Sequence, residues 1–308
     1  MNAKRTAALL FSASLAVTAF ADEGKLIPIA RPEGAPATVA EAVKQLHESG
    51  ARTPHVMKAP RLLKNGVRPN VIEYETADSA FLIPAAGSVQ GSNGTFFRSD
   101  LTIGNFNGND QNIGVGWLAS GQDNSSSPLT FFIVPKNTIS VYNDFVGQQL
   151  HKSGLGALLV IAYDSTGKTV DSEAFIDGFS RIWTPQPGST GTTSQSFPAV
   201  SVLDSSDNFT AFALGLRLDA NYRTNAGIVN LDTVAHTWTV TSINTGATMQ
   251  ITVPPFSMSQ PGVPANFGSQ AGNLSLTYDV NAVNFFWSAY ASSVDNTTGD
   301  GWVSRATQ

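Results

Sequence analysis

The stretch FRSDLTIGN, from Phe97 to Asn105, decides the fold because the chain uses it twice. It returns as YRTNAGIVN, from Tyr222 to Asn230, at an offset of 125 (222 − 97). Both copies begin with an aromatic residue and an arginine, both end on an asparagine, and both alternate apolar with polar positions. A period of two is typical of a strand with one buried face. The two stretches therefore predict equivalent half-buried strands.

The likeness continues in the same order along both halves of the chain. The matches are Val115 with Val240 and Gly121 with Gly246 at 125, Val134-Pro135 with Val253-Pro254 and Ser140 with Ser259 at 119 (253 − 134), and Leu159, Ile161, Tyr163 and Asp164 with Leu274, Leu276, Tyr278 and Asp279 at 115 (274 − 159). The offset first falls in the polar loop at 121–128, which is longer in the first copy and where insertions cost little. Such an ordered series predicts an internal duplication.

Residues 1–21 have the pattern of a secretory signal peptide. Lys4 and Arg5 precede an apolar run, and Ala19-Phe20-Ala21 is a small-x-small cleavage site before Asp22. No cysteine follows the run, and no later stretch is suited to a membrane-spanning helix. We therefore expect cleavage between Ala21 and Asp22. The mature protein is then secreted, whether extracellular, at the cell surface or in the periplasm, with no transmembrane segment and no disulfides.

Residues 22–80 differ from the rest of the chain because charged residues are much denser there. We interpret them as a leader that holds one helix at 38–50 and an extended, proline-rich connector. Thr38 is a candidate N-cap with Glu41 completing a capping box, and Val39, Val43 and Leu46 form an apolar stripe. The connector predicts a leader that opens more easily than the rest.

The remaining sequence predicts two all-β domains. Residues 81–186 and 197–308 are rich in Val, Ile, Thr, Phe and Trp, and turn residues interrupt them about every ten positions, as in an antiparallel β-sandwich. The Pro, Gly, Ser and Thr residues at 187–196 suggest a linker between the two domains.

Two stretches carry a resemblance to a known group of proteins. NGTFFRSDL, from Asn93 to Leu101, and AYASSVDNTTGD, from Ala289 to Asp300, resemble signature stretches of secreted bacterial proteins of unknown function with tandem immunoglobulin-like β-sandwich repeats. The resemblance covers roughly residue 81 to the end. It implies tandem immunoglobulin-like sandwiches and export, and it implies no activity and no catalytic residues.

The search for enzymatic residues gives little. The sequence has no Gly-x-Ser-x-Gly elbow and no His-x-x-x-His pair. Asp171, Glu173 and Asp177 have the spacing of one strand face, and paired carboxylates would suit a glycoside hydrolase. Alternating charges on an exposed strand explain them more simply. We therefore expect a non-enzymatic protein without catalytic, metal or cofactor residues, and a secreted hydrolase with unplaced carboxylates stays open.

Non-catalytic binding has more support. The chain has five tryptophans, of which Trp183 and Trp302 lie near loops, so a carbohydrate-binding role is an alternative to a surface, adhesion or structural module. Asp295 and Asp300 lie in a loop where calcium or simple turn chemistry fits equally. The mature chain has 16 basic residues (18 − 2) against 23 acidic ones, which disfavours nucleic acid. Expected partners are a cell-surface protein or a polysaccharide.

The repeated stretch also supplies the candidate site residues, which we expect to be structural. Residues two apart on a strand share a face, so Arg98 is expected to pair with Asp100, and Arg223 with Asn225. Such exposed pairs contribute about 0–1 kcal/mol. The repeat-equivalent structural residues are therefore Arg98, Asp100, Asn105, Arg223, Asn225 and Asn230.

Overall fold

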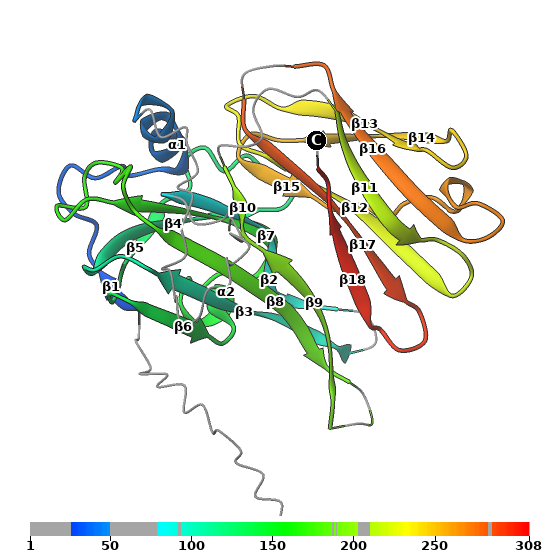
Figure 1. The fold of residues 1–308 in the computed structure, drawn as a ribbon, viewed down its shortest axis with the longest axis horizontal. Coiled ribbons are helices and arrows are strands. Elements are labelled where there is room, and N and C mark those ends of the chain that lie inside the picture. Colours follow the sequence, from blue (N-terminus) through cyan, green and yellow to red (C-terminus); the bar gives the residue numbers. More distant parts are fainter. Residues whose placement is uncertain are drawn as a thin grey trace, which may run out of the picture.

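The computed structural model describes residues 26–49, 79–91, 94–186, 188, 190–202, 210–282 and 285–307. In these ranges the protein is all-β, and every ladder between its strands is antiparallel. The strands gather into two bodies that lie side by side, which we call the first and second units (Figure 1). No helix in the described part of the chain is long and apolar enough to cross a membrane.

The first unit consists of two layers of four strands. Its strands are β2 (Ala80–Gln90), β3 (Phe96–Asn105), β4 (Gln111–Ala119), β5 (Leu129–Val134), β6 (Thr138–Tyr142), β7 (Gly154–Tyr163), β8 (Ile176–Pro185) and β9 (Thr192–Pro198). The layers are ordered β5-β4-β7-β2 and β6-β3-β8-β9, and they join where the ends of β2 and β3 pair. A short helix, α2 (Phe145–Gln148), follows β6.

The second unit repeats this arrangement. Its strands are β11 (Thr210–Arg217), β12 (Tyr222–Asn230), β13 (His236–Ser242), β14 (Thr248–Val253), β15 (Ser257–Ser259), β16 (Asn273–Val280), β17 (Trp287–Asp295) and β18 (Gly301–Arg305), with a 3-10 turn, η3 (Ala265–Phe267). Its two sheets are ordered β14-β13-β16-β11 and β15-β12-β17-β18. Within these layers each strand therefore has the same neighbours as its counterpart in the first unit, whereas the pairing of β2 with β3 has no counterpart between β11 and β12.

The ladder partners give the difference in residue number between each strand of the first unit and its counterpart in the second. It is 130 for β2 and β11 (213 − 83), 125 for β3 and β12 and for β4 and β13, 119 for β5 and β14 and for β6 and β15, 118 for β7 and β16, 111 for β8 and β17, and 107 for β9 and β18. Even the irregularity in the first strand recurs, between Ile83 and Ala86 and between Ala213 and Leu216. The offsets of 125 and 119 are those of the sequence, and Gly121 and Gly246 share a φ of 75°.

One offset from the sequence is wrong. Tyr278 pairs with Val240, and the equivalent Val115 pairs with Val160, so β7 and β16 differ by 118 rather than 115. The reason is that β7 is buried on both faces from Gly156 to Tyr163. A strand without a polar face has no alternation to fix its register, so a match shifted by three residues still looks apolar.

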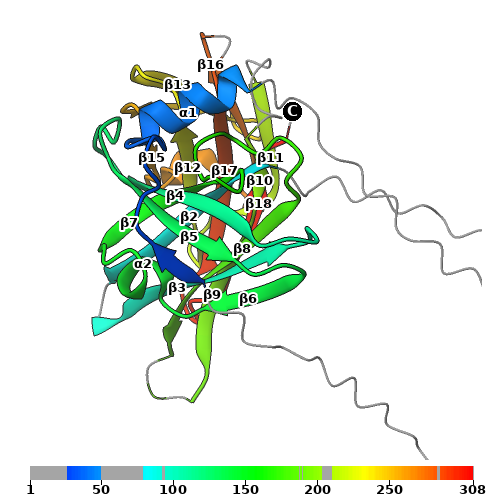
Figure 2. The same cartoon turned by 90° about the vertical axis from the view of Figure 1, so that its left-hand side faces the viewer.

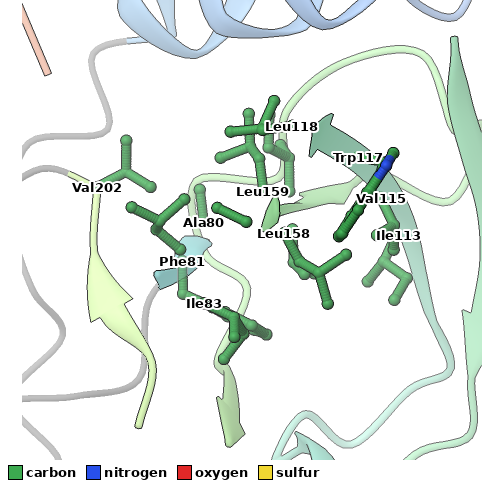
Figure 3. Packing of buried hydrophobic residues seen from close by; sticks show 14 of the residues in the cluster. Ala80, Phe81, Ile83, Ile113, Val115, Trp117, Leu118, Leu158, Leu159 and Val202 are labelled. Atoms are coloured by element: carbon green, nitrogen blue, oxygen red, sulfur yellow. The ribbon is translucent and has the colours of Figure 1, made fainter. Parts of the chain in front are cut away.

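Each unit packs around an apolar cluster. In the first unit, Ile113 and Val115 of β4, Leu158 of β7, and Phe81 and Ile83 of β2 belong to one buried cluster (Figure 3). In the second, a cluster around the fully buried Trp238 takes residues from both sheets. The first cluster also includes Met258, Phe286 and Tyr290 of the second unit, so the interior continues across the junction.

The leader is part of the first unit. β1 (Ile27–Ile29) pairs with β5, and α1 (Val39–Glu48) buries Val39, Val43 and Leu46 in the larger cluster. The expected helix and its N-cap are confirmed: Thr38 Oγ1 accepts the N–H of Glu41 at 3.3 Å, although Glu41 reaches back to Ala37 rather than to Thr38. The expected connector lies almost entirely outside the described residues.

One glycine explains why the helix docks there. A Cβ at Gly116 of β4 would lie 2.9 Å from Val39 Cγ2, whereas a Cβ at Gly114 would meet Tyr163, Leu129 and Phe131 rather than the helix. The gap is filled by Val39 and Leu129. The leader predicted at 22–80 is therefore not separate over residues 26–49, where β1 pairs with β5 and α1 packs into the core of the first unit.

The linker expected at 187–196 is also wrong over much of its length. Thr192–Pro198 forms β9, which pairs along the whole of its length with β8, and Gln186 N–H closes the hairpin onto Gly191 O at 3.0 Å. Thr193 and Phe197 are buried. Ser and Thr are common in linkers, but their spacing here gives one face of an edge strand. The first unit continues to β10 (Val200–Ser201), which pairs with β2.

The loop between β4 and β5, residues 120–128, joins the two units and α1. The N–H of Gly121 donates to Met258 O (3.1 Å), and the side-chain amide of Asn124 donates to Phe256 O (2.9 Å). The same loop accepts the first free N–H groups of the helix, since Val39 N–H donates to Ser127 O (2.9 Å). Figure 2 shows α1 crossing the top of the molecule beside the second unit.

Candidate functional site

Asn105 and Asn230 perform the same structural task in the two units. Asn105 Nδ2 donates to the carbonyls of Asn109, Val134 and Pro135 at 3.0–3.2 Å, and its Oδ1 accepts the N–H of Asn107. Asn230 Nδ2 donates to Val234, Val253 and Pro254 at 2.8–3.2 Å, and its Oδ1 accepts the N–H of Asp232. Both side chains are fully buried and fully bonded. They fasten the β3–β4 turn to the end of β5 and the β12–β13 turn to the end of β14.

The expected Arg98–Asp100 pair is wrong. The structure describes both side chains and has no ion pair between them. The Arg98 guanidinium lies 4.9 Å from the Phe96 ring centre and 5.8 Å from that of Trp183, while Asp100 Oδ1 accepts the N–H of Asp144 at 3.1 Å. Asp144 has a φ of 45° and caps α2. Asp100 is therefore occupied by a strained turn, and aromatic rings stabilise the arginine instead.

Arg223 also has a different partner from the one expected. Its Nη1 donates to Asn296 Oδ1 at 2.8 Å, across to the loop after β17, while Asn225 makes an isolated bridge with Gly262. Arg223 thus braces a loop through its planar set of donors. Arg98 and Arg223 are equivalent in register and not in contacts, because position 183 is Trp and its counterpart, position 294, is Val.

The calcium and signal-peptide expectations have different outcomes. Asp295 Oδ1 accepts the N–H groups of Thr297 and Thr298 at 2.7 and 3.1 Å, which is ordinary turn chemistry. Within the described ranges no group of three His, Cys, Asp or Glu residues could hold a metal. Ala21 and Asp22, the predicted cleavage site, lie outside the described residues.

The three candidate carboxylates do not share a strand. Asp171 and Glu173 lie in the turn before β8, where Asp171 Oδ1 accepts the N–H of Glu173 at 3.1 Å, and only Asp177 is in the strand. Burial raises the pKa of Asp177, and the N–H of Gly178 at 2.7 Å opposes that rise only in part. The sequence suggested one strand face because no pattern of apolar residues marks where the turn ends and β8 begins.

Of the two tryptophans expected to be freer, only Trp302 is exposed. It packs edge-on against Tyr222 and donates to Gly215 O at 2.9 Å. Trp183 lies between Arg98 and Arg181, and its indole nitrogen is buried without a partner. Neither tryptophan lines the cleft described next, so this pair does not form a shared binding surface with it.

A cleft of about 480 Å³ lies on the first unit. It lies between the end of β4, the 120–128 loop and the segment 151–155, and its polar residues include Gln122, Asn124, His151 and Lys152. Trp117 is part of its apolar lining with Ala119, Pro128 and Leu155, although the Trp117 side chain is only 7% exposed. An indole beside amide, hydroxyl and cationic groups is suited to a polar, hydroxyl-rich ligand.

The cleft is specific to the first unit. Between the last ladder pairs, the connection from β4 to β5 is six residues longer than the turn from β13 to β14 (125 − 119). Asn124 is buried and bonds to the carbonyls of Ala119, Gln122 and Phe256, so the loop has a fixed shape. Sequence reasoning noticed the insertion and missed its role. Insertions on a rigid scaffold often carry functional residues, so the length of this insertion could have pointed to the site.

No model of a known protein family matches the chain, and no curated protein is similar to it. The site is therefore described by its own geometry alone.

Proposed function

We propose that the chain is an exported, non-enzymatic protein of two tandem immunoglobulin-like β-sandwich units that acts as a surface or adhesion module. One observation carries the proposal: the first unit adds an insertion that both fastens it to the second unit and α1 and shapes a polar cleft. Binding residues are often carried by loops that a rigid scaffold holds in place.

A carbohydrate-binding role is the second candidate, and the cleft favours it. A sugar ring presents an apolar face and several hydroxyls, which Trp117 and the side chains of Gln122, His151 and Lys152 would match. Lys152 adds a charge that an acidic sugar would use. The Asp171 carboxylate accepts the backbone N–H of Glu173 within the turn, and Asp177 lies apart from both on β8, which does not favour the hydrolase alternative.

The proposal is tested by screening the mature chain against neutral and acidic polysaccharides and against intact cells, with analysis of the sugars released. Saturable binding without release of shorter sugars is expected. Release of oligosaccharides would overturn the non-enzymatic reading, and the absence of binding to any cell or polysaccharide would overturn the surface role.

The cleft is tested by Lys152→Ala and Gln122→Ala, both at exposed positions. Each is expected to weaken saccharide binding about tenfold, since each removes one polar contact. Lys44→Ala, an exposed lysine on α1, is the matched control and is expected to bind as the wild type does. Equal binding by all variants would place the ligand elsewhere.

A further inference from the structure

The outer face of β6, β3 and β8 has exposed apolar side chains. Ile139 is 60% and Val141 62% exposed on β6, and Phe179 is 37% exposed on β8. The ladders place Val141, Thr102 and Phe179 in one row across the three strands, and Ile139, Gly104 and Asp177 in the next. We call these two rows the open face. Isolated apolar residues on a surface are ordinary, whereas a contiguous group on a sheet marks a contact surface.

The equivalent face of the second unit is already an interface. Ile139 corresponds to Met258 (offset 119) and Phe179 to Tyr290 (offset 111). Met258 is fully buried and its carbonyl accepts the N–H of Gly121, while the Tyr290 ring packs edge-on against Phe197 at 5.4 Å. In one unit this face of the repeat packs on protein, and in the other the same positions stay apolar and open.

Neither unit, in the part of the chain that the structure describes, offers a free copy of the surface that covers this face in the second unit. In the first unit it is the outer side of β4, β7 and β2, which α1 and the second unit already cover. In the second unit the corresponding side is polar, with Thr239 and Thr277 at the positions of Gly114 and Leu159. Repetition of the internal contact into an open chain of molecules is therefore disfavoured, and a closed, two-fold contact of the open face with itself is the alternative.

The charges on this face complement themselves. Asp177 and Arg181 lie on β8, two residues to either side of Phe179 and on the same face. Neither Asp177 nor Arg181 has an ion-pair partner among the described residues, and the Arg181 guanidinium donates to Thr192 Oγ1 (2.6 Å) and lies 5.8 Å from the centre of the Trp183 ring. A two-fold axis along the row of Val141 and Phe179 places Arg181 of each copy opposite Asp177 of the other.

We propose that two copies of this chain associate through the open face, with Ile139, Val141 and Phe179 at the centre and Arg181–Asp177 pairs at both sides. The contact is isologous, so the same residues act on both copies. It uses a face that the repeat is built to bury, and it leaves the 120–128 loop and the cleft outside the interface residues.

Sedimentation velocity of the mature chain over a concentration series tests the proposal. The wild type is expected to form a concentration-dependent dimer, and Ile139→Lys with Val141→Lys is expected to be monomeric. Leu214→Lys with Val234→Lys, at 57% and 53% exposure, is the matched control and should dimerise normally. A wild type that stays monomeric to about 0.1 mM, or a dimer that survives the Ile139 and Val141 changes, would overturn the proposal.

A charge exchange tests the two-fold geometry. Arg181→Glu is expected to weaken dimerisation at least about tenfold, because it puts like charges opposite each other. Adding Asp177→Lys to the same chain restores opposite charges and is expected to recover most of the loss. Circular dichroism of each variant checks the fold. A double variant that dimerises no better than Arg181→Glu alone would contradict the Arg181–Asp177 contact.

Discussion

Asn105 and Asn230 make the same three hydrogen bonds in two different parts of the chain. Each side-chain amide donates to the backbone carbonyl four residues later in the chain. It also donates to the carbonyls of a Val–Pro pair, at the end of β5 for Asn105 and at the end of β14 for Asn230. Similar sequences in two strands could arise from amino-acid composition alone. A buried amide with the same set of partners requires the same turn, the same register and the same following strand.

The first prediction concerns these two amides. Asn105→Ala and Asn230→Ala each leave buried carbonyls without a donor, so each is expected to lower the free energy of unfolding by about 1–3 kcal/mol. The two losses should add in the double variant, because the residues share no partner. Chemical denaturation measures all three. Asn109→Ala, at an exposed position, is the control. If Asn105→Ala lowers the free energy of unfolding no more than Asn109→Ala does, the hydrogen bonds of Asn105 do not stabilise the fold as proposed.

The second prediction concerns the docking of α1 on β4. Gly116→Ala puts a methyl group 2.9 Å from Val39 Cγ2 and is expected to destabilise the protein by about 1–3 kcal/mol. Val39→Ala alone should also be destabilising, and in the double variant it should recover part of the loss from Gly116→Ala. Denaturation of the four proteins gives the coupling energy. Strictly additive losses would mean that the helix does not pack on Gly116.

The third prediction concerns acid and the 120–128 loop. The hydroxyl and N–H of Ser125 both donate to Asp123 Oδ1, which lowers the pKa of that carboxyl. Because the folded pKa is below the unfolded value of about 4, the stabilisation is present above that value and is lost as the pH falls through the folded pKa. Asp123→Asn should therefore differ in Tm from the wild type near neutral pH and converge with it in acid. A constant difference at all pH values would contradict this.

The fourth prediction concerns the repeated arginines. Arg98→Ala removes contacts with two aromatic rings, and Arg223→Ala removes a brace on the loop after β17, so each should cost about 0.5–1 kcal/mol. Neither should change binding to cells or polysaccharides once folding is corrected for. Denaturation beside the binding screen measures both effects. Full stability with lost binding would make these arginines recognition residues.

The sequence predicted the strand class, the duplication and the helix because those features have local periods. The alternation in FRSDLTIGN and the stripe of Val39, Val43 and Leu46 both follow from one buried face. Prediction from the sequence failed for β7, where both faces are buried and apolar residues do not alternate with polar ones. It also failed for β9, whose Ser and Thr residues suggested a linker. The docking of α1 depends on the absence of a side chain at Gly116, which a pattern of apolar residues does not reveal.

The site was harder to predict than the fold. The partners of Arg98, Asp100 and Arg223 come from other strands and loops, so spacing along one strand pointed to the wrong pairs. The cleft depends on how the 120–128 loop folds back on the second unit through Asn124. The length of that insertion was visible in the sequence, and its shape was not.

Disulfide formation between introduced cysteines tests the equivalence of the two units most directly, because the natural chain has no cysteine. Asn112 lies opposite Ile133, and Thr237 lies opposite Thr252 at the corresponding place in the second unit. Cysteines at either pair are expected to oxidise to a disulfide in the folded protein, as opposed strand positions are within bridging distance. Thr237→Cys with Ile251→Cys points to opposite faces and should keep free thiols. A disulfide in only one unit, or in the slipped pair, would contradict a shared strand order and register.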